Sequence, residues 1–266
     1  MNDRVLQATR NLNLLNKTFF LLVLFLLAIS GFSQSGDSTK FISHFSGNIS
    51  ATNNGISLIP SFNLGKPAVV FNLSVGGDKL SFDPQLRFAM EGKPWSFIFW
   101  WRYQLIQNEK FQVRLGVHPA LSFKEINIIK DGTSMEIIRV RRYLAAELAP
   151  NFKISKSIAI SPYYLYANGI ENDLVQHTQY IALQSSFSSV KLSDQLNFEI
   201  RPQIYLLKMD DLHGYYFASS FSLLKNNFPI SLSLMINKTI ESEIASDDFI
   251  WSASVIYSFG KKYTQL

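Results

Sequence analysis

The sequence of 266 residues contains no cysteine, which excludes disulfide bonds, a thiolate nucleophile and any cysteine-ligated metal site. Charged residues are scarce as well, at 17% of the chain, compared with about a quarter in soluble globular proteins. Long hydrophobic runs are missing too. The longest, Phe19–Ile29, has 11 residues, whereas a membrane-spanning helix needs roughly 20. These shortages argue against a helical membrane protein and against a domain whose whole surface meets water.

Motifs that would carry chemistry are also absent from the sequence. There is no glycine-rich phosphate loop and no Gly-x-Ser-x-Gly nucleophile motif. The four histidines, at positions 44, 118, 177 and 213, do not have the spacing of metal ligands. The net charge of +5 is spread along the chain without a basic run. We therefore expect no metal site, no cofactor and no nucleic-acid partner.

Aromatic residues and a two-residue period dominate what is present. There are 22 Phe and 11 Tyr in an aromatic content of 14%, and the mean hydropathy is +0.07. Apolar and polar residues alternate in the segments 80–88, 111–118, 196–204, 230–234 and 249–259. Alternation of this kind indicates β-strands with two different surroundings. One face in lipid and the other in water would explain both the alternation and the intermediate hydropathy.

The spacing of the breaks predicts that these strands close into an antiparallel transmembrane β-barrel. From residue 107 onward, short polar turns alternate with longer, more acidic connections such as 130–133, 169–173, 209–212 and 241–248. This asymmetry is typical of outer-membrane barrels. The strands run to about 10–15 residues, enough to cross a bilayer at a tilt of roughly 40°. We predict about 12 strands, within a range of about 10 to 14, in one all-β domain over residues 35–266.

The region 41–75 leaves the strand count open. Pieces at 42–52, 56–63 and 68–75 would bring the total to an odd number, which does not fit a barrel with both termini on one side. Either one break is a bulge inside a long strand, or the first piece lies outside the wall.

Residues 1–34 are expected to be a signal peptide. A positively charged segment, 1–17, precedes the apolar run Phe19–Ile29, whose length fits the roughly 7–15 residues of a secretory h-region. Small residues in 30–36 predict cleavage between positions 31 and 35, and the missing cysteine excludes a lipoprotein anchor. An uncleaved anchor or a buried helix is the alternative. Export through this segment predicts an outer-membrane location.

Three features of the chain point to a family. They are Gly31-Phe32-Ser33-Gln34 at the end of the signal segment, the strand pattern, and the aromatic strand that ends in Phe259. In these features the chain resembles the small outer-membrane β-barrels of Bacteroidota, without any functional motif. The resemblance implies contact with outer-membrane lipid and insertion by the barrel-assembly machinery, and it leaves other partners unspecified.

Several aromatic residues fall near predicted strand ends, where rings suit the headgroup boundary of a bilayer. These are Trp95, Tyr163, Tyr164, Tyr166, Tyr215, Tyr216 and Tyr257. The alternative is an ordinary β-sandwich core, although the strands are longer than the about 5–6 residues usual in globular proteins.

If the apolar face of each strand meets lipid, the polar face lines the lumen. The candidate lumen-facing residues are Asp83, Arg87, Arg102, Arg114, His118, Arg139, Arg141, Glu147, Glu199 and Arg201, together with Gln85 and Gln104. Arginine outnumbers acid in this set. A barrel of this size favours either a packed, salt-bridged interior or a narrow path that prefers anions.

One pair of residues suggests an enzyme. His44 and Ser46 have the His-x-Ser spacing that resembles outer-membrane lipid hydrolases such as phospholipase A and the lipid A deacylase, and this spacing places both side chains on one face of a strand. No acid or amide is placed in the sequence to orient His44. We therefore predict a non-enzymatic barrel with a structural or narrow-pore role. A lipid hydrolase and a soluble periplasmic β-rich binding module are the alternatives.

Overall fold

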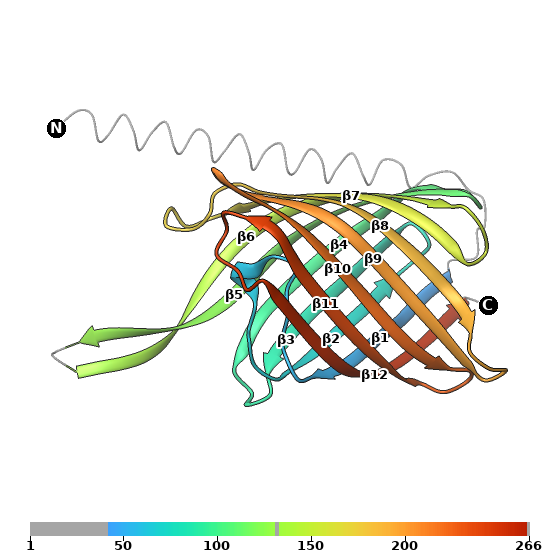
Figure 1. The fold of residues 1–266 in the computed structure, drawn as a ribbon, viewed down its shortest axis with the longest axis horizontal. Helices are drawn as coiled ribbons and strands as arrows, with labels where there is room; N and C mark the ends of the chain where they lie inside the picture. Colours follow the sequence, from blue (N-terminus) through green and yellow to red (C-terminus); the bar gives the residue numbers. More distant parts are fainter. Residues whose placement is uncertain (1–41, 131–132, 265–266) are drawn as a thin grey trace. The chain divides into compact units, whose positions relative to one another are not determined.

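A computed structural model describes residues 42–130 and 133–264. Within these ranges the chain forms twelve antiparallel strands that close into one barrel, with β1 paired to β12 (Figure 1). The predicted fold class and strand number are confirmed. In the same residues, no helix is long and apolar enough to cross a membrane.

The strands are long, as the spacing of the breaks predicts. They are β1 (Ile42–Thr52), β2 (Ala68–Gly76), β3 (Leu80–Ala89), β4 (Pro94–Gln107), β5 (Phe111–Lys130), β6 (Thr133–Lys153), β7 (Ile158–Gly169), β8 (Thr178–Lys191), β9 (Leu196–Met209), β10 (Leu212–Lys225), β11 (Ile230–Ser242) and β12 (Phe249–Thr264).

The two ends of the barrel differ in their connections. Ile42 of β1 lies opposite Thr264 of β12, so both ends of the described barrel chain lie at one end, which we call the terminal end. The five hairpin turns at this end are short. The opposite end, the loop end, carries the longer connections 53–67, 170–177 and 243–248. The alternation of short and long connections follows the sequence pattern.

Two loop-end connections differ from the prediction. The break at 209–212 is a tight turn rather than a longer loop, because Asp210 adopts the left-handed conformation (φ 52°) that two-residue hairpin turns need. The break at 130–133 lies at the tip of a long hairpin. Residues 123–130 pair only with 133–140, and they leave the wall as a two-stranded ribbon (Figure 1).

The segment 56–63 is not a strand, and this settles the uncertain count. It contains a single 3₁₀ turn, Pro60–Phe62. Proline has no N–H to give to a strand ladder and suits the start of a helical turn. Gly65 follows in the left-handed conformation, with φ 73°. Neither predicted alternative is correct, because 42–52 is in the wall as β1 and the middle piece is the one that leaves it.

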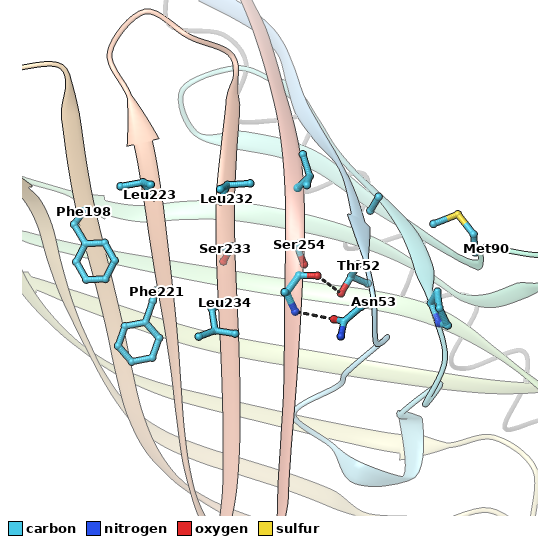
Figure 2. Close-up of a pocket in the computed structure, with 14 residues that line it drawn as sticks. Thr52, Asn53, Met90, Phe198, Phe221, Leu223, Leu232, Ser233, Leu234 and Ser254 are labelled. Carbon is cyan, nitrogen blue, oxygen red and sulfur yellow. Dashed lines mark hydrogen bonds between the residues drawn. The ribbon is translucent and has the colours of Figure 1, made fainter.

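The wall has a polar inner face and an apolar outer face. Arg102 of β4 reaches Glu147 of β6 across the inner face of β5. Residues that alternate in step with these two along their strands therefore also point inward. Residues of the other parity point outward, and Val117 and Leu144 there are 56% and 54% exposed. Figure 2 shows apolar side chains of β9, β10 and β11 side by side on this outer face: Phe198, Phe221, Leu223, Leu232 and Leu234.

Side chains close the seam between the first and last strands. Thr52 Oγ1 donates to the Ala253 carbonyl (3.2 Å), and the Ala253 N–H donates to Asn53 Oδ1 (2.8 Å) (Figure 2). The hydroxyls of Thr52 and Ser252 are also hydrogen-bonded, at 2.5 Å. Closure satisfies the backbone groups that an edge strand would leave open, which a bilayer does not tolerate.

Candidate functional site

The inner wall carries a charged cluster around Glu147. The Glu147 side chain is 1% exposed. Its Oε1 accepts hydrogen bonds from Arg102 Nε (2.9 Å) and Arg114 Nε (3.1 Å), and its Oε2 accepts one from the Tyr163 hydroxyl (2.7 Å). Arg102 continues the network to Asp83, with Nη1 and Oδ2 3.1 Å apart. The cluster therefore ties β3 through β7 together, with two arginines balanced by two carboxylates.

Gly116 allows this cluster to form. It lies on β5 between Arg102 and Glu147 in the strand ladder. A Cβ at this position would lie 2.7 Å from the Cγ atom of Glu147, so any side chain would displace the carboxylate. The missing side chain opens the path by which Arg102 and Glu147 meet across the intervening strand.

His44 and Ser46, the predicted lipid-hydrolase pair, lie on the inner face, where His44 is hydrogen-bonded to a different serine. His44 Nε2 is hydrogen-bonded to Ser74 Oγ (2.9 Å), and Ser74 Oγ donates to Asp83 Oδ1 (2.6 Å). An imidazole activates a hydroxyl that donates to it, whereas the Ser74 hydroxyl donates its hydrogen bond to the Asp83 carboxylate. Ser46 lines an interior cavity beside Asp83 and Arg102. The pair therefore faces away from the apolar outer surface, where a lipid substrate would be.

Toward the terminal end, the lumen is polar and incompletely filled. Three cavities of about 420, 380 and 310 Å³ lie along the inner wall. The first two share Ser161 and Gln184, and the last two share Arg102. Most of their lining is amide, hydroxyl and guanidinium: Asn48, Asn72, Gln85, Gln104, Gln112, Arg114, Asn151, Arg201, Gln203 and Ser220. This half of the lumen has room for water and small polar solutes.

Toward the loop end, a hydrophobic core occupies part of the lumen. Its members are Tyr180, Ala182, Tyr205, Leu207, Met209, Tyr216, Ala218 and Ile244, all at most 7% exposed. Leu58, Ile59 and Val175 pack against this core. The connections β1–β2, β7–β8 and β11–β12 therefore contribute apolar side chains that close this end of the lumen.

Residues 53–67 form the plug segment, which folds inward at the loop end. Trp95 Nε1 donates to the Phe62 carbonyl (2.8 Å), and the Tyr205 hydroxyl donates to the Leu58 carbonyl (3.1 Å). The ring of Phe62 meets that of Tyr143 edge-on, with centroids 5.0 Å apart. These contacts attach the plug segment to β4, β6 and β9, so it crosses the lumen. Each neutral hydrogen bond contributes only about 1 kcal/mol.

An ion-pair group at the rim also holds the plug segment. Lys66 Nζ lies 2.5 Å from Glu91 and 3.6 Å from Glu125, while Lys93 contacts Glu125 and lies 2.9 Å from Glu136. The hydrogen bond to Glu91 raises the pKa of Lys66 above its ordinary 10.5. The hydrogen bond from Lys93 lowers the pKa of Glu125 below its ordinary 4.5. These side chains are well exposed, so salt screens the pairs.

The other predicted lumen residues lie at separate places on the wall. His118 is buried against Trp100, with ring centroids 4.1 Å apart. Its Nδ1 has no hydrogen-bond partner in the part of the chain that the structure describes. Glu199 and Arg201 pair with each other on β9 at 2.8 Å. Within residues 42–130 and 133–264, no group of three or more ligand-type side chains gathers as a metal site.

Arg87, Arg139 and Arg141 lie nearer the loop end. Arg139 Nη2 pairs with Asp173 of the β7–β8 connection at 2.6 Å. The guanidinium of Arg87 lies 5.2 Å from the centre of a Trp95 ring. Arg141 has no ion-pair partner among the described residues. The predicted set therefore divides into a central cluster, isolated pairs and a group at the plug.

The prediction for strand-end aromatics is wrong for three residues. Trp95 and Tyr216 are 4% and 1% exposed, and Tyr163 donates to the central cluster. All three point into the barrel. The signal was available, because alternation places Tyr163 and Tyr216 on the opposite face from their outward-facing neighbours Tyr164 and Tyr215.

Sequence reasoning missed three other parts of the site. Ser74 follows the alternation of β2 and was assignable to the inner face. Gly116 interrupts a regular strand, which is a known signal of close approach by another group. The pattern predicts a strand piece at 56–63 within the plug segment, although Pro60 near its centre argues against that assignment.

Comparison with known proteins places the chain only loosely. No protein-family model and no curated protein matches it. An outer-membrane channel from Pseudomonas putida F1 has a TM-score of 0.46 and 10% identity, covering 86% of this chain and 98% of that chain. LpxR from Salmonella typhimurium has a TM-score of 0.47 and 11% identity, covering 80% of this chain and 99% of that chain. The NanC porin has a TM-score of 0.45 and 11% identity, covering 83% of this chain and 100% of that chain. Likenesses this weak carry nothing about role, which rests on the residues of this chain.

Proposed function

We propose that this protein is an outer-membrane β-barrel that provides a narrow path for small polar solutes and is closed at rest by its plug segment. The observation that carries the proposal is the contrast within the lumen. The terminal half holds three polar cavities of about 310–420 Å³, while at the loop end the core and the plug segment cross the lumen beside a cavity of about 360 Å³. A barrel serving only as a scaffold would gain by packing its interior throughout.

The outer face supports the membrane location. Val117, Ile204 and Leu232 are each more than half exposed, and they belong to an apolar surface that runs from strand to strand. Transfer of one such side chain out of water stabilises by about 1.5–3 kcal/mol. Soluble monomers rarely expose apolar patches this extensive. This surface favours the membrane barrel over the soluble periplasmic binding module.

The route to the membrane is part of the same proposal. The signal peptide expected at residues 1–34 lies outside the described residues. Export through it, insertion by the barrel-assembly machinery and a Bacteroidota-type origin stay predictions. We also propose that the protein has no enzymatic activity. His44 and Ser46 point inward, and the Ser74 hydroxyl donates to Asp83 rather than to His44.

Current measurements in planar lipid bilayers test the path. Replacing residues 56–64 with a short Gly-Ser linker removes the plug contacts at Leu58 and Phe62. We expect small, intermittent currents from the wild type and larger, sustained currents from this variant. The matched control deletes residues 128–135 from the far end of the β5–β6 ribbon, so it retains Glu125 and Glu136 of the rim ion pairs, and it should keep the wild-type currents. If the linker variant inserts, as shown by a heat-dependent gel shift, but conducts no more than lipid alone, the barrel has no path.

A single substitution provides a finer test of closure. Trp95→Phe removes the N–H that bonds to the Phe62 carbonyl and shortens a ring that packs beside the plug segment, so openings should become more frequent by at least about fivefold, the equivalent of one lost hydrogen bond. Trp251→Phe changes a tryptophan that is 49% exposed and should leave the frequency unchanged. Equal opening in both variants would mean that Trp95 does not hold the plug segment.

A further inference from the structure

We propose that the loop end contains a binding site for a small organic oxyanion, a molecule with a phosphate or carboxylate group, with Arg141 as its principal ligand. A cavity of about 360 Å³ lies between residues 61–66 of the plug segment and the inner wall at Trp95, Ser122 and Arg141. This volume is suitable for a small organic ligand. The site is separate from the polar cavities of the terminal half, and the proposal does not depend on conduction.

The strand register places complementary donors in one row across the wall. Arg87 on β3 is opposite Ser96 on β4, Ser96 is opposite Ser122 on β5, and Ser122 is opposite Arg141 on β6. Neighbouring strands are about 4.8 Å apart. The row therefore presents two hydroxyls between two guanidinium groups, all on the inner face. Guanidinium and hydroxyl donors are the groups that proteins use to hold phosphate and carboxylate.

Three cations of this region lack carboxylate partners among the described residues. Arg141 and Lys124 form no ion pair with any described carboxylate, and Arg87 donates only to the Gln85 amide oxygen, at 3.0 Å. By contrast, Arg139 and Arg142 of the same strand β6 each pair at 2.6 Å with a carboxylate of the β7–β8 connection. On β6, the arginine without a carboxylate partner is therefore the one that lines the cavity.

Two buried polar atoms in the row are also unsatisfied. Arg141 Nε and Ser96 Oγ have no hydrogen-bond partner among the described residues. Ser96 is only 6% exposed. Buried donors without partners destabilise a fold. An oxyanion would supply an acceptor to Arg141 and complete the hydrogen bonding of this part of the wall.

The charge around the cavity selects an anion. Four cations (Lys66, Lys93, Lys124 and Arg141) line it, and the nearby carboxylates Glu91, Glu125 and Glu136 are engaged by Lys66 and Lys93 at the mouth. Trp95 and Phe62 supply an apolar wall. The ligand therefore combines one negatively charged group with an uncharged organic part.

Titration calorimetry on the full-length protein in detergent, at low ionic strength, tests the site. The probes are glucose 6-phosphate, glucuronate and inorganic phosphate, with glucose as the neutral control. We expect saturable binding of a charged probe and none of glucose, and the stronger of the two charged sugars identifies the preferred group. Failure of all three anions to saturate would overturn the proposal.

Matched arginine substitutions locate the binding. Arg141→Gln should weaken binding by about tenfold or more, and Arg139→Gln, which alters an arginine already paired with Asp173, should change it by less than about twofold. Lys124→Gln should weaken binding as well, and it replaces Arg141→Gln if that variant lacks the wild-type heat-dependent gel shift. Two results would show nonspecific attraction instead of a site. One is that Arg141→Gln, or Lys124→Gln in its place, binds as well as the wild type. The other is that this variant and Arg139→Gln lose the same amount of binding.

Discussion

Glu147 has the most closely surrounded carboxylate in the barrel, because donors from three different strands converge on it. Arg102, Arg114 and Tyr163 all bond to its two oxygens. A buried charge held in this way adds little stability when compared with an apolar replacement. Removing one partner, however, leaves the remaining charges buried without compensation, which destabilises the fold. We therefore expect the cluster to be sensitive to single changes and to determine how β3 through β7 are arranged.

Glu147→Gln tests this expectation. The substitution keeps the size of the side chain but leaves Arg102 and Arg114 without their shared charge, and it should lower the free energy of unfolding by about 3 kcal/mol. Glu199→Gln is the control, because its partner Arg201 is 62% exposed and such pairs contribute less than about 1 kcal/mol. Urea unfolding in lipid vesicles measures both. Similar losses for the two variants would contradict a special role for the buried cluster.

At the scale of single elements, the middle of the plug segment is held by few hydrogen bonds. Between Gly55 and Lys66 its attachments to the wall are two hydrogen bonds to backbone carbonyls, packing against the core, and rim ion pairs whose side chains are 34–54% exposed. Regions with few buried contacts open at lower free energy than the strands around them. The plug segment can therefore move while the closed ladder of the wall stays intact.

Acid should release the plug segment. The pKa of Glu125 is lowered by Lys93, so its contribution to closure is complete above its ordinary 4.5 and is lost as the pH falls through the lowered value. The pKa of Lys66 is raised, so its contribution is complete below 10.5 and is lost only as the pH rises through the raised value. Open probability in bilayers should therefore rise when the pH falls below 4.5.

The matched variants for the acid effect differ only in the position of the glutamate. Glu125→Gln should reduce the pH dependence, because the group that titrates is gone. Glu109→Gln, which lies in a turn at the terminal end, should keep the wild-type profile. An unchanged profile in Glu125→Gln would exclude the rim ion pairs as the cause.

At the scale of the whole molecule, closure and surface chemistry determine where the protein is stable. Within the wall all twelve strands pair on both sides, so the wall leaves no open strand edge to lipid, and open edges occur in the β5–β6 ribbon outside it. The outward-facing side chains are apolar, while polar cavities lie inside. This inverted distribution is what a bilayer requires of a membrane-spanning sheet.

Adjacent residues of β8 separate the two faces experimentally. Leu183 is 47% exposed on the outer face, and Gln184 lines two interior cavities. Leu183→Arg should destabilise the barrel in lipid by about 2–4 kcal/mol, whereas Gln184→Arg should change stability by less than about 1 kcal/mol. The fraction folded in vesicles, measured by the heat-dependent gel shift, reports both. If Leu183→Arg folds as well as Gln184→Arg, the outer face does not meet lipid.

Much of the wall could be predicted because its rule is local. Successive side chains of a strand point to opposite faces, so alternation alone places Asp83, Arg102 and Glu147 together on one face. The same rule would have placed Tyr163 inward, had it been applied to aromatics as strictly as to charges. The plug segment escaped prediction because Leu58, Ile59 and Phe62 are apolar enough to resemble part of a strand.

The amino-acid sequence by itself determined that this chain forms about a dozen strands, which face of each is apolar, and at which end the connections are long. These properties depend on neighbours along the chain. The tertiary structure alone decided that Glu147 meets Arg102 over Gly116, that His44 bonds to Ser74, and that residues 53–67 fold into the lumen. Such contacts depend on strand order and on the stagger of a closed sheet, which bring together residues that no local pattern connects.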